Sequence, residues 1–210
     1  MSSAFAVYLE LGFRHIADLA GYDHLLFIVA LAAGYGFSHW RELLVLVTAF
    51  TVGHSITLAL ATLRVVAMSS VWVEFLIPLT ILLTALNTLW EQRTVSADAA
   101  ATHRPPDSPA GHLRGRRVKY GMALFFGLIH GMGFSNFLRA LLGEEEGIAW
   151  PLFSFNVGLE IGQLVILAAL LLLTWVVVRL LRVRPVTWTR FLSLGAALPA
   201  LALLASRVPG

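Results

Sequence analysis

The sequence predicts an all-α fold: a polytopic transmembrane bundle of about six helices, with an N-terminal interfacial helix. The first observation behind this prediction is composition. The 210 residues are 58% hydrophobic and only 13% charged, with a mean hydropathy of +0.80. A soluble domain carries about 25% charged residues, so most of this chain has to face lipid or its own interior. The second observation is a series of apolar runs close to 20 residues long, the length that crosses a bilayer.

Five runs reach or approach that length: 41–63, 71–90, 119–141, 150–179 and 187–206. A sixth run, 23–38, is short but bounded by polar groups. Residues 3–19 are apolar with charged and imidazole residues interspersed, which indicates an interfacial helix. Residues 91–118 are rich in Ala, Pro and Arg, and we expect them to link two groups of three spans. We treat 1–210 as a single transmembrane domain.

The basic residues are distributed unequally between the two sides of such a bundle. The loops after the first, third and fifth spans hold 11 of the 15 Lys and Arg residues. The positive-inside rule therefore places 91–118 in the cytosol and both termini outside, as in a multi-pass protein of a bacterial-type cytoplasmic (inner) membrane. Because the net charge of +3 arises from these loops, we expect the lipid bilayer as a partner and no nucleic acid. The oligomeric state stays open.

Several polar side chains fall at membrane depth, where inserting a charged group costs at least ~2.5 kcal/mol. We estimated their depth at about 1.5 Å per residue from the predicted cytosolic ends. They converge on one level, between the midplane and the outer edge of a ~30 Å hydrocarbon core. Imidazole and carboxylate ligands suit divalent transition metals. We therefore expect a Ni, Co or Zn ion, with these candidate ligands: His15, Asp23, His24, His54, His130 and Glu160.

Each candidate also has a purely structural interpretation. His54 is close to hydroxyl residues in TAFTVGHSITLAL and could serve interhelical hydrogen bonding. Asp23 is a plausible N-cap. Glu160 could be a neutral carboxyl bonded on its own helix face. Glu74 could reach the outer interface, so its membership of the site stays open. Glycine pairs spaced four apart, at 127 and 131 and at 158 and 162, predict close helix packing.

The motifs around these residues resemble a known family. GFRHIADLAGYDHLLFIVAL, TAFTVGHSITLAL, VEFLIPLTIL, FFGLIHGMGFSN and FNVGLEIGQL occur in that order over roughly residues 10–170, and together they resemble the HupE/UreJ family of membrane proteins. The resemblance implies a permease-like protein that handles nickel or cobalt. It also implies that His15, Asp23 and His24 form the metal-recognition motif, with His54 and His130 as later motif histidines.

The chain departs from the nickel-permease form of this motif in two places. Seven residues separate His15 from Asp23, two more than in that form. Phe27 stands where the motif has a methionine, so a soft thioether ligand is missing. These departures indicate a divergent branch of the family.

Three functions are compatible with the residues. The first is a metal-ion permease, in which the ion enters from outside and passes the histidines. The second is a membrane-embedded metal-dependent hydrolase with Glu160 or Glu74 as general base. The third is a non-catalytic scaffold that uses the polar groups for packing. The sequence leans towards transport, because it holds no recognised catalytic motif.

Overall fold

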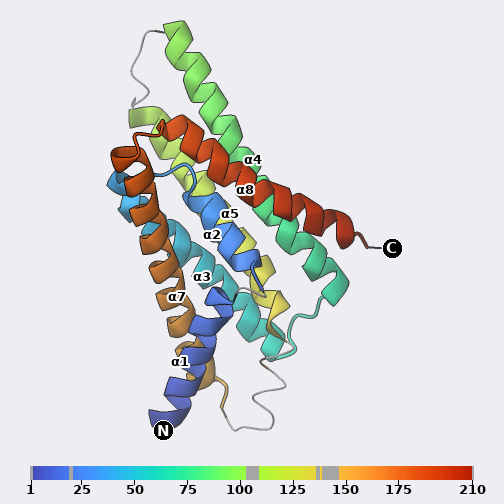
Figure 1. The fold of residues 1–210 in the computed structure, drawn as a ribbon. Helices are drawn as coiled ribbons and strands as arrows, with labels where there is room; N and C mark the ends of the chain where they lie inside the picture. The colour runs from blue at the N-terminus through green and yellow to red at the C-terminus, as the bar shows by residue number, and fades with distance from the viewer. Residues whose placement is uncertain (1, 19–20, 103–108, 136–137, 139–146, 210) are drawn as a thin grey trace.

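The computed structural model describes residues 2–18, 21–102, 109–135, 138 and 147–209, and their regular structure is entirely helical (Figure 1). The all-α prediction is confirmed. The seven α-helices of the described residues are α1 (Ser2–Ala17), α2 (Asp23–Ala32), α3 (Trp40–Thr62), α4 (Ser70–Thr102), α5 (Pro109–Gly133), α7 (Ala149–Trp175) and α8 (Pro185–Ser206). A 3₁₀ turn, η1 (Phe37–His39), precedes α3, and a π-helical turn, η2 (Val176–Leu180), extends α7.

Four of the described helical segments are long and apolar enough to cross a membrane. They cover Phe37–Thr62, Ser70–Thr94, Ala149–Leu180 and Pro185–Ser206, and Asp23–Ala32 is a shorter apolar helix. The protein is therefore a multi-pass membrane protein, as predicted, while the count of about six spans stays a prediction. The run at 119–141 corresponds to α5 as far as Gly133, and residues 136–137 and 139–141 lie outside the described part of the chain.

Exposed tryptophans lie towards both ends of the long helices. Trp72 and Trp150 stand in the first turns of α4 and α7, whereas Trp40, Trp90 and Trp175 lie towards the opposite end. Along α4 the two groups are 18 residues apart, about 27 Å, close to the thickness of a hydrocarbon core. Such belts are typical of membrane interfaces. We call the end with Trp72 and Trp150 the histidine end and the other the lysine end.

The packing joins helices from before and after the 91–118 segment. The most extensive contacts pair α3 with α5, α1 with α7 and α4 with α8, and α2 lies against α4, α8 and α7 (Figure 1). Helices of the two predicted groups of three are thus interleaved. The described part of 91–118 is itself helical, because α4 continues to Thr102 and α5 begins at Pro109. Residues 103–108 lie outside the described residues.

The interfacial position of helix α1 stays a prediction, and the structure shows how the helix packs. It runs alongside the first half of α7, which is long enough to span (Figure 1). A Cβ added at Gly12 would overlap the carbonyl of Phe155, and one at Gly158 would overlap that of Leu9. This backbone-to-backbone contact aligns α1 with a spanning helix instead of laying it across the end of the bundle. Its charged residues at positions 10 and 14 form an exposed ion pair of 2.7 Å, so α7 packs without meeting an isolated charge.

The contact between α3 and α5 is equally close, and it positions two of the candidate ligands. A Cβ at Gly127 would overlap the carbonyl of Phe50, and a Cβ at Gly131 would overlap that of His54. The predicted packing role of the glycine pair is confirmed. Because the backbones touch here, the side chains of His54 and of His130, the residue before Gly131, enter the same buried region.

Candidate metal centre

The N-terminal motif is assembled from the facing ends of two helices. His15 lies in the last turn of α1, and α2 begins with Asp23 followed by His24. The ring centroids of His15 and His24 are 4.7 Å apart. The N-cap position of α2 is Tyr22, and no side chain forms a capping hydrogen bond there. Asp23 is therefore not the N-cap that the sequence allowed, and its carboxylate is directed elsewhere.

His54 of α3 completes a triad with these two residues. Its ring centroid lies 6.0 Å from that of His15 and 5.9 Å from that of His24. One potential ligand atom from each of the three histidines lies within 4.8 Å of the other two. Nitrogen ligands of a single tetrahedral ion sit roughly 3.3 Å apart, given metal–nitrogen bonds of about 2.0 Å. Small side-chain rotations would therefore bring the three imidazoles onto one ion.

His130 of α5 lies beside the triad and is held by a hydroxyl of α4. Its ring centroid is 5.2 Å from that of His24. The Thr80 hydroxyl donates to the carbonyl of Ile77 at 2.7 Å and lies 2.9 Å from Nε2 of His130. A Thr80 hydroxyl that directs its proton to Ile77 accepts from an Nε2–H of His130 and thereby favours the tautomer with its lone pair on Nδ1, in the way that outer hydrogen bonds orient metal-ligating histidines.

The four imidazoles share a second property, which is that buried ring nitrogens are left without hydrogen-bond partners among the described residues. These atoms are Nε2 of His15, Nε2 of His24, both ring nitrogens of His54 and Nδ1 of His130. A buried polar atom without a partner is unfavourable by about 1–3 kcal/mol. Several such atoms converging from four helices match the donor set of a transition-metal ion, which prefers neutral imidazole nitrogens. The residues present therefore fit such an ion.

A cavity of about 290 Å³ opens this cluster towards the histidine end. Its lining includes His15, His24 and His130, together with Met68, from the connection between α3 and α4, and Ser70, the first residue of α4. Its ionisable lining residues also include Asp18, Asp23, Glu74 and Arg207. The cavity thus joins imidazole and carboxylate groups.

Asp23 and Glu74 give this cavity its negative charge. An Asp23 oxygen, Oδ2, lies 3.5 Å from the Arg207 guanidinium, whereas Oδ1 is buried with no hydrogen-bond partner in the described chain. Glu74 lines the same cavity and interacts electrostatically with Asp23. Glu74 thus lines the same cavity as three of the histidines, and its membership of a metal site stays a prediction.

Glu160, in contrast, is not brought to the imidazoles. Its Oε1 accepts a hydrogen bond of 2.7 Å from the Thr48 hydroxyl. Thr48 precedes His54 by six residues, about 9 Å along α3. Gln163, one turn further along α7, accepts a 2.7 Å hydrogen bond from Thr51. Both contacts fasten α7 to α3, which is the structural interpretation of Glu160, with Thr48 as its partner.

Two residues of this region were not singled out from the sequence. Thr80 carries no motif signal, although it lies six residues after Glu74 on the same helix. Arg207 counted only as one of the few basic residues on the predicted outer side. Its pairing with Asp23 joins positions 184 residues apart in the chain, and no local pattern reports such a contact.

Comparison with known protein families finds a match over nearly the whole chain. The family model described as HupE / UreJ protein matches residues 1–207. The chain belongs to the HupE/UreJ family. The match covers all four histidines of the cluster and confirms the resemblance found in the motifs. Searches of curated proteins and of solved structures found no match for this HupE/UreJ protein.

Proposed function

We propose that this HupE/UreJ protein is a permease for a divalent transition-metal ion of the nickel or cobalt type. The observation that carries the proposal is the triad of His15, His24 and His54, whose ligand atoms lie within 4.8 Å of one another inside a bundle of membrane helices. Nickel and cobalt uptake is the association of the family, and the neutral imidazole donors suit both ions. The ion is the substrate, held in transit.

The cavity supports entry from the histidine end. A divalent cation leaving water needs compensation for its lost hydration, and Asp23 and Glu74 supply negative charge along the cavity wall. The ion then exchanges bound waters for the imidazoles of His15, His24 and His54, with His130 beside them. Glu160 is left out of this ligand set, because it is bonded to Thr48.

The direction of transport follows from the charge distribution. Under the positive-inside rule the basic lysine end faces the cytosol, so the cavity faces outward and the protein imports its ion. Both termini then lie outside, with the connection between α4 and α5 in the cytosol. The crossing that completes six spans is formed by α1 and α2 in series, which together follow the length of α7.

The test uses purified protein and a matched histidine control. Cobalt binding is followed by visible absorption and calorimetry, and nickel uptake is measured in proteoliposomes. His24→Ala and His54→Ala each remove a triad ligand. We expect each to weaken metal binding by about 100-fold, since losing even an outer partner costs 10–100-fold. His39→Ala removes a histidine of η1, at the lysine end, and should leave binding and uptake unchanged.

Two results would contradict the proposal. If the wild-type protein binds neither cobalt nor nickel, the triad is not a metal site. If it binds metal but proteoliposomes accumulate no more nickel than protein-free vesicles, the site binds an ion without transporting it. Thermal unfolding of each variant in detergent distinguishes loss of ligand from loss of fold.

A further inference from the structure

A line of polar side chains continues along α4 beyond the histidine cluster. Its members stand three or four residues apart and therefore share one helix face: Thr80, Thr84, Asn87, Thr88 and Glu91. Thr80 contacts His130 at the start of the line. Glu91 is 11 residues further on, about 16 Å towards the lysine end. The line thus connects the site of the proposed substrate to the opposite end of the bundle.

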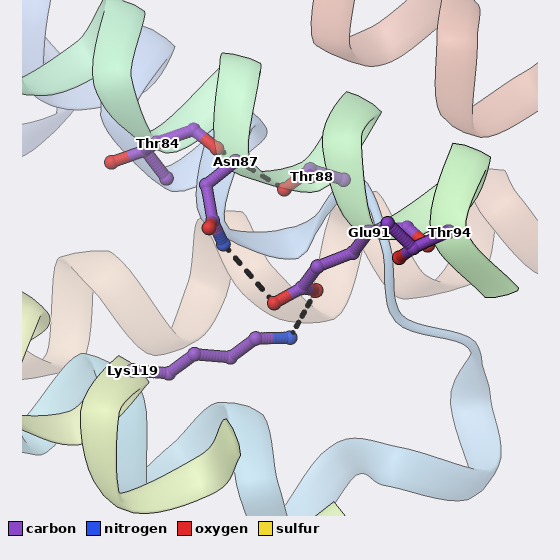
Figure 2. Close-up of polar contacts among 6 residues, drawn as sticks. All are labelled: Thr84, Asn87, Thr88, Glu91, Thr94 and Lys119. Carbon is purple, nitrogen blue, oxygen red and sulfur yellow. Dashed lines mark hydrogen bonds and ion pairs between the residues drawn. The ribbon is translucent and has the colours of Figure 1, made fainter. Parts of the chain in front are cut away.

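An ion pair stands at the far end of this line (Figure 2). Nζ of Lys119 in α5 lies 2.6 Å from Oε2 of Glu91, and Asn87 donates a hydrogen bond of 3.2 Å to the other carboxylate oxygen. Lys119 also lies 5.2 Å from the centroid of the Tyr35 ring. The ammonium therefore occupies the place where a cation on this route would meet its last carboxylate.

A second, smaller cavity lies between a group of buried phenylalanine rings and this ion pair. Its volume is about 30 Å³, and its polar lining consists of Tyr35, Thr84, Asn87, Thr88 and Lys119. A polar cavity of this size has room for at least one water molecule. The hydroxyls of Thr84 and Thr88 donate to backbone carbonyls one turn earlier, so each hydroxyl oxygen keeps lone pairs that can accept hydrogen bonds from such water.

Three buried phenylalanines separate the two cavities. The rings of Phe27 and Phe50 stack at 4.5 Å and lie 5.2 and 5.1 Å from the ring of His130, which lines the large cavity. Phe126 meets Phe27 edge-on at 6.3 Å and lines the small cavity. We call these three residues the aromatic layer. It is apolar and close-packed, so it blocks ions and water in this conformation.

We propose that the polar face of α4 is the exit half of the ion route, closed here by the aromatic layer and gated at its far end by the Glu91–Lys119 ion pair. This inference rests on the proposed function, because the route serves the ion held by the histidines. It adds the polar face of α4 as the path of the ion, the aromatic layer as the point where the path is closed, and the Glu91–Lys119 ion pair as its gate. When the layer parts, the hydrated ion follows the hydroxyls and Asn87 to Glu91, and Lys119 turns away to release it.

The route is tested with single cysteines, since the chain contains none of its own. Thr84→Cys and Thr88→Cys place a thiol on the proposed route. Leu83→Cys and Leu86→Cys place one on the exposed, lipid-facing side of the same helix. The protein is held in lipid nanodiscs and treated with a cationic, water-soluble methanethiosulfonate. Only a thiol that reaches water forms the reactive thiolate.

We expect the cysteine at position 88 to react at least tenfold faster than the one at 86. The reaction rate of the cysteine at position 84 should increase when Ni²⁺ is added. If neither route position reacts faster than its lipid-facing neighbour, with or without Ni²⁺, the route does not exist. Labelling needs no metal, so a protein that binds no nickel but labels at position 88 would overturn the permease proposal while keeping a water-filled route.

The gate is tested by separating binding from transport. Lys119→Met and Glu91→Gln should leave nickel affinity at the histidines within about twofold and change the rate of nickel uptake at least fivefold. Arg93→Gln alters an exposed charge two residues from Glu91 and should change neither quantity. If Lys119→Met and Glu91→Gln take up nickel at the wild-type rate, the Glu91–Lys119 ion pair is not a gate.

Discussion

The two ends of the bundle handle charge in opposite ways. At the histidine end, imidazole nitrogens that have no hydrogen-bond partner among the described residues belong to side chains that line a cavity of about 290 Å³, together with Asp23 and Glu74. At the lysine end, the carboxylate of Glu91 is already satisfied by Lys119 and Asn87 beside a cavity of only about 30 Å³. The histidine end can accept a cation, whereas the carboxylate at the lysine end is already paired with the ammonium group of Lys119.

This difference would allow one membrane bundle to bind an ion without leaking it. Binding requires donor atoms that no protein group has satisfied, whereas a closed barrier requires the opposite, with every polar atom paired and the remaining space filled by apolar rings. The polar groups of α4 contribute to both ends, through Thr80 next to His130 and through Glu91 next to Lys119. The comparison can be sharpened by changing one end at a time.

The largest contrast should come from the carboxylates. A carboxylate within a few ångströms of a divalent ion contributes on the order of several kcal/mol at an effective dielectric constant of about 20. We therefore expect the double substitution Asp23→Asn with Glu74→Gln to weaken nickel binding by about 100-fold or more. Glu91→Gln, which removes one carboxylate at the lysine end, should leave the calorimetric Kd unchanged. If both variants lost nickel affinity equally, the distinction between the two ends would be contradicted.

The next effect concerns the backbone contact between α3 and α5. A Cβ at Gly127 would overlap the Phe50 carbonyl, whereas Gly121, two turns earlier on α5, has open space around it. Gly127→Ala should therefore lower the free energy of unfolding by about 1–3 kcal/mol. Gly121→Ala should be neutral or stabilising by up to about 1 kcal/mol, because alanine favours the helix. Thermal unfolding in detergent measures both, and an equally stable Gly127→Ala would contradict the backbone contact.

A smaller effect is expected at the junction of the two regions. Thr80→Val removes the hydroxyl that is hydrogen-bonded to Nε2 of His130 at 2.9 Å. Loss of such an outer partner typically weakens metal affinity by about tenfold. Thr80→Ser restores the hydroxyl and should restore the affinity, which a purely steric effect of valine would not predict. Cobalt titrations followed by absorption provide the comparison. An unchanged Kd for Thr80→Val would remove His130 from the site.

The smallest effect should appear at the mouth of the large cavity. Arg207 pairs with Asp23 at 3.5 Å and competes with an incoming cation for that carboxylate. Arg207→Gln should therefore tighten nickel binding several-fold, most clearly at low ionic strength, where such charges are least screened. Calorimetry at two salt concentrations tests this. Weaker binding in the variant would mean that Arg207 supports Asp23 in the site and does not compete for it.

Much of the fold could be predicted because hydropathy is a local property. The runs that became α3, α4, α7 and α8 needed only their own residues to be recognised. Glu10 and Arg14 led to the prediction of α1 as an interfacial helix. The structure pairs these two charges with each other on the exposed face, while Gly12 faces α7. Charge content alone does not report which face of a helix carries the charge.

The site was predictable in part for a similar reason. Counting residues from the helix ends gives the depth of a side chain, and the depth placed His24, His54 and His130 at one level, where the structure brings their rings close together. It does not give the direction around the helix axis, and Glu160, which was grouped with the histidines by depth, is hydrogen-bonded to Thr48 in the structure. Contacts such as Asp23 with Arg207, or Glu91 with Lys119, depend on how distant helices meet. No pattern within either segment encodes them.

The separation of α1 from α2 has a mechanical consequence. His15 belongs to one helix and His24 to the next, so an ion that binds both fixes the angle at the joint between them. Phe27 follows His24 by three residues on the same short helix and is stacked on Phe50. Any tilt of α2 imposed by the ion therefore pulls directly on that stack. Ligation of both histidines by one ion would therefore shift the population towards a conformation in which the aromatic layer is loosened.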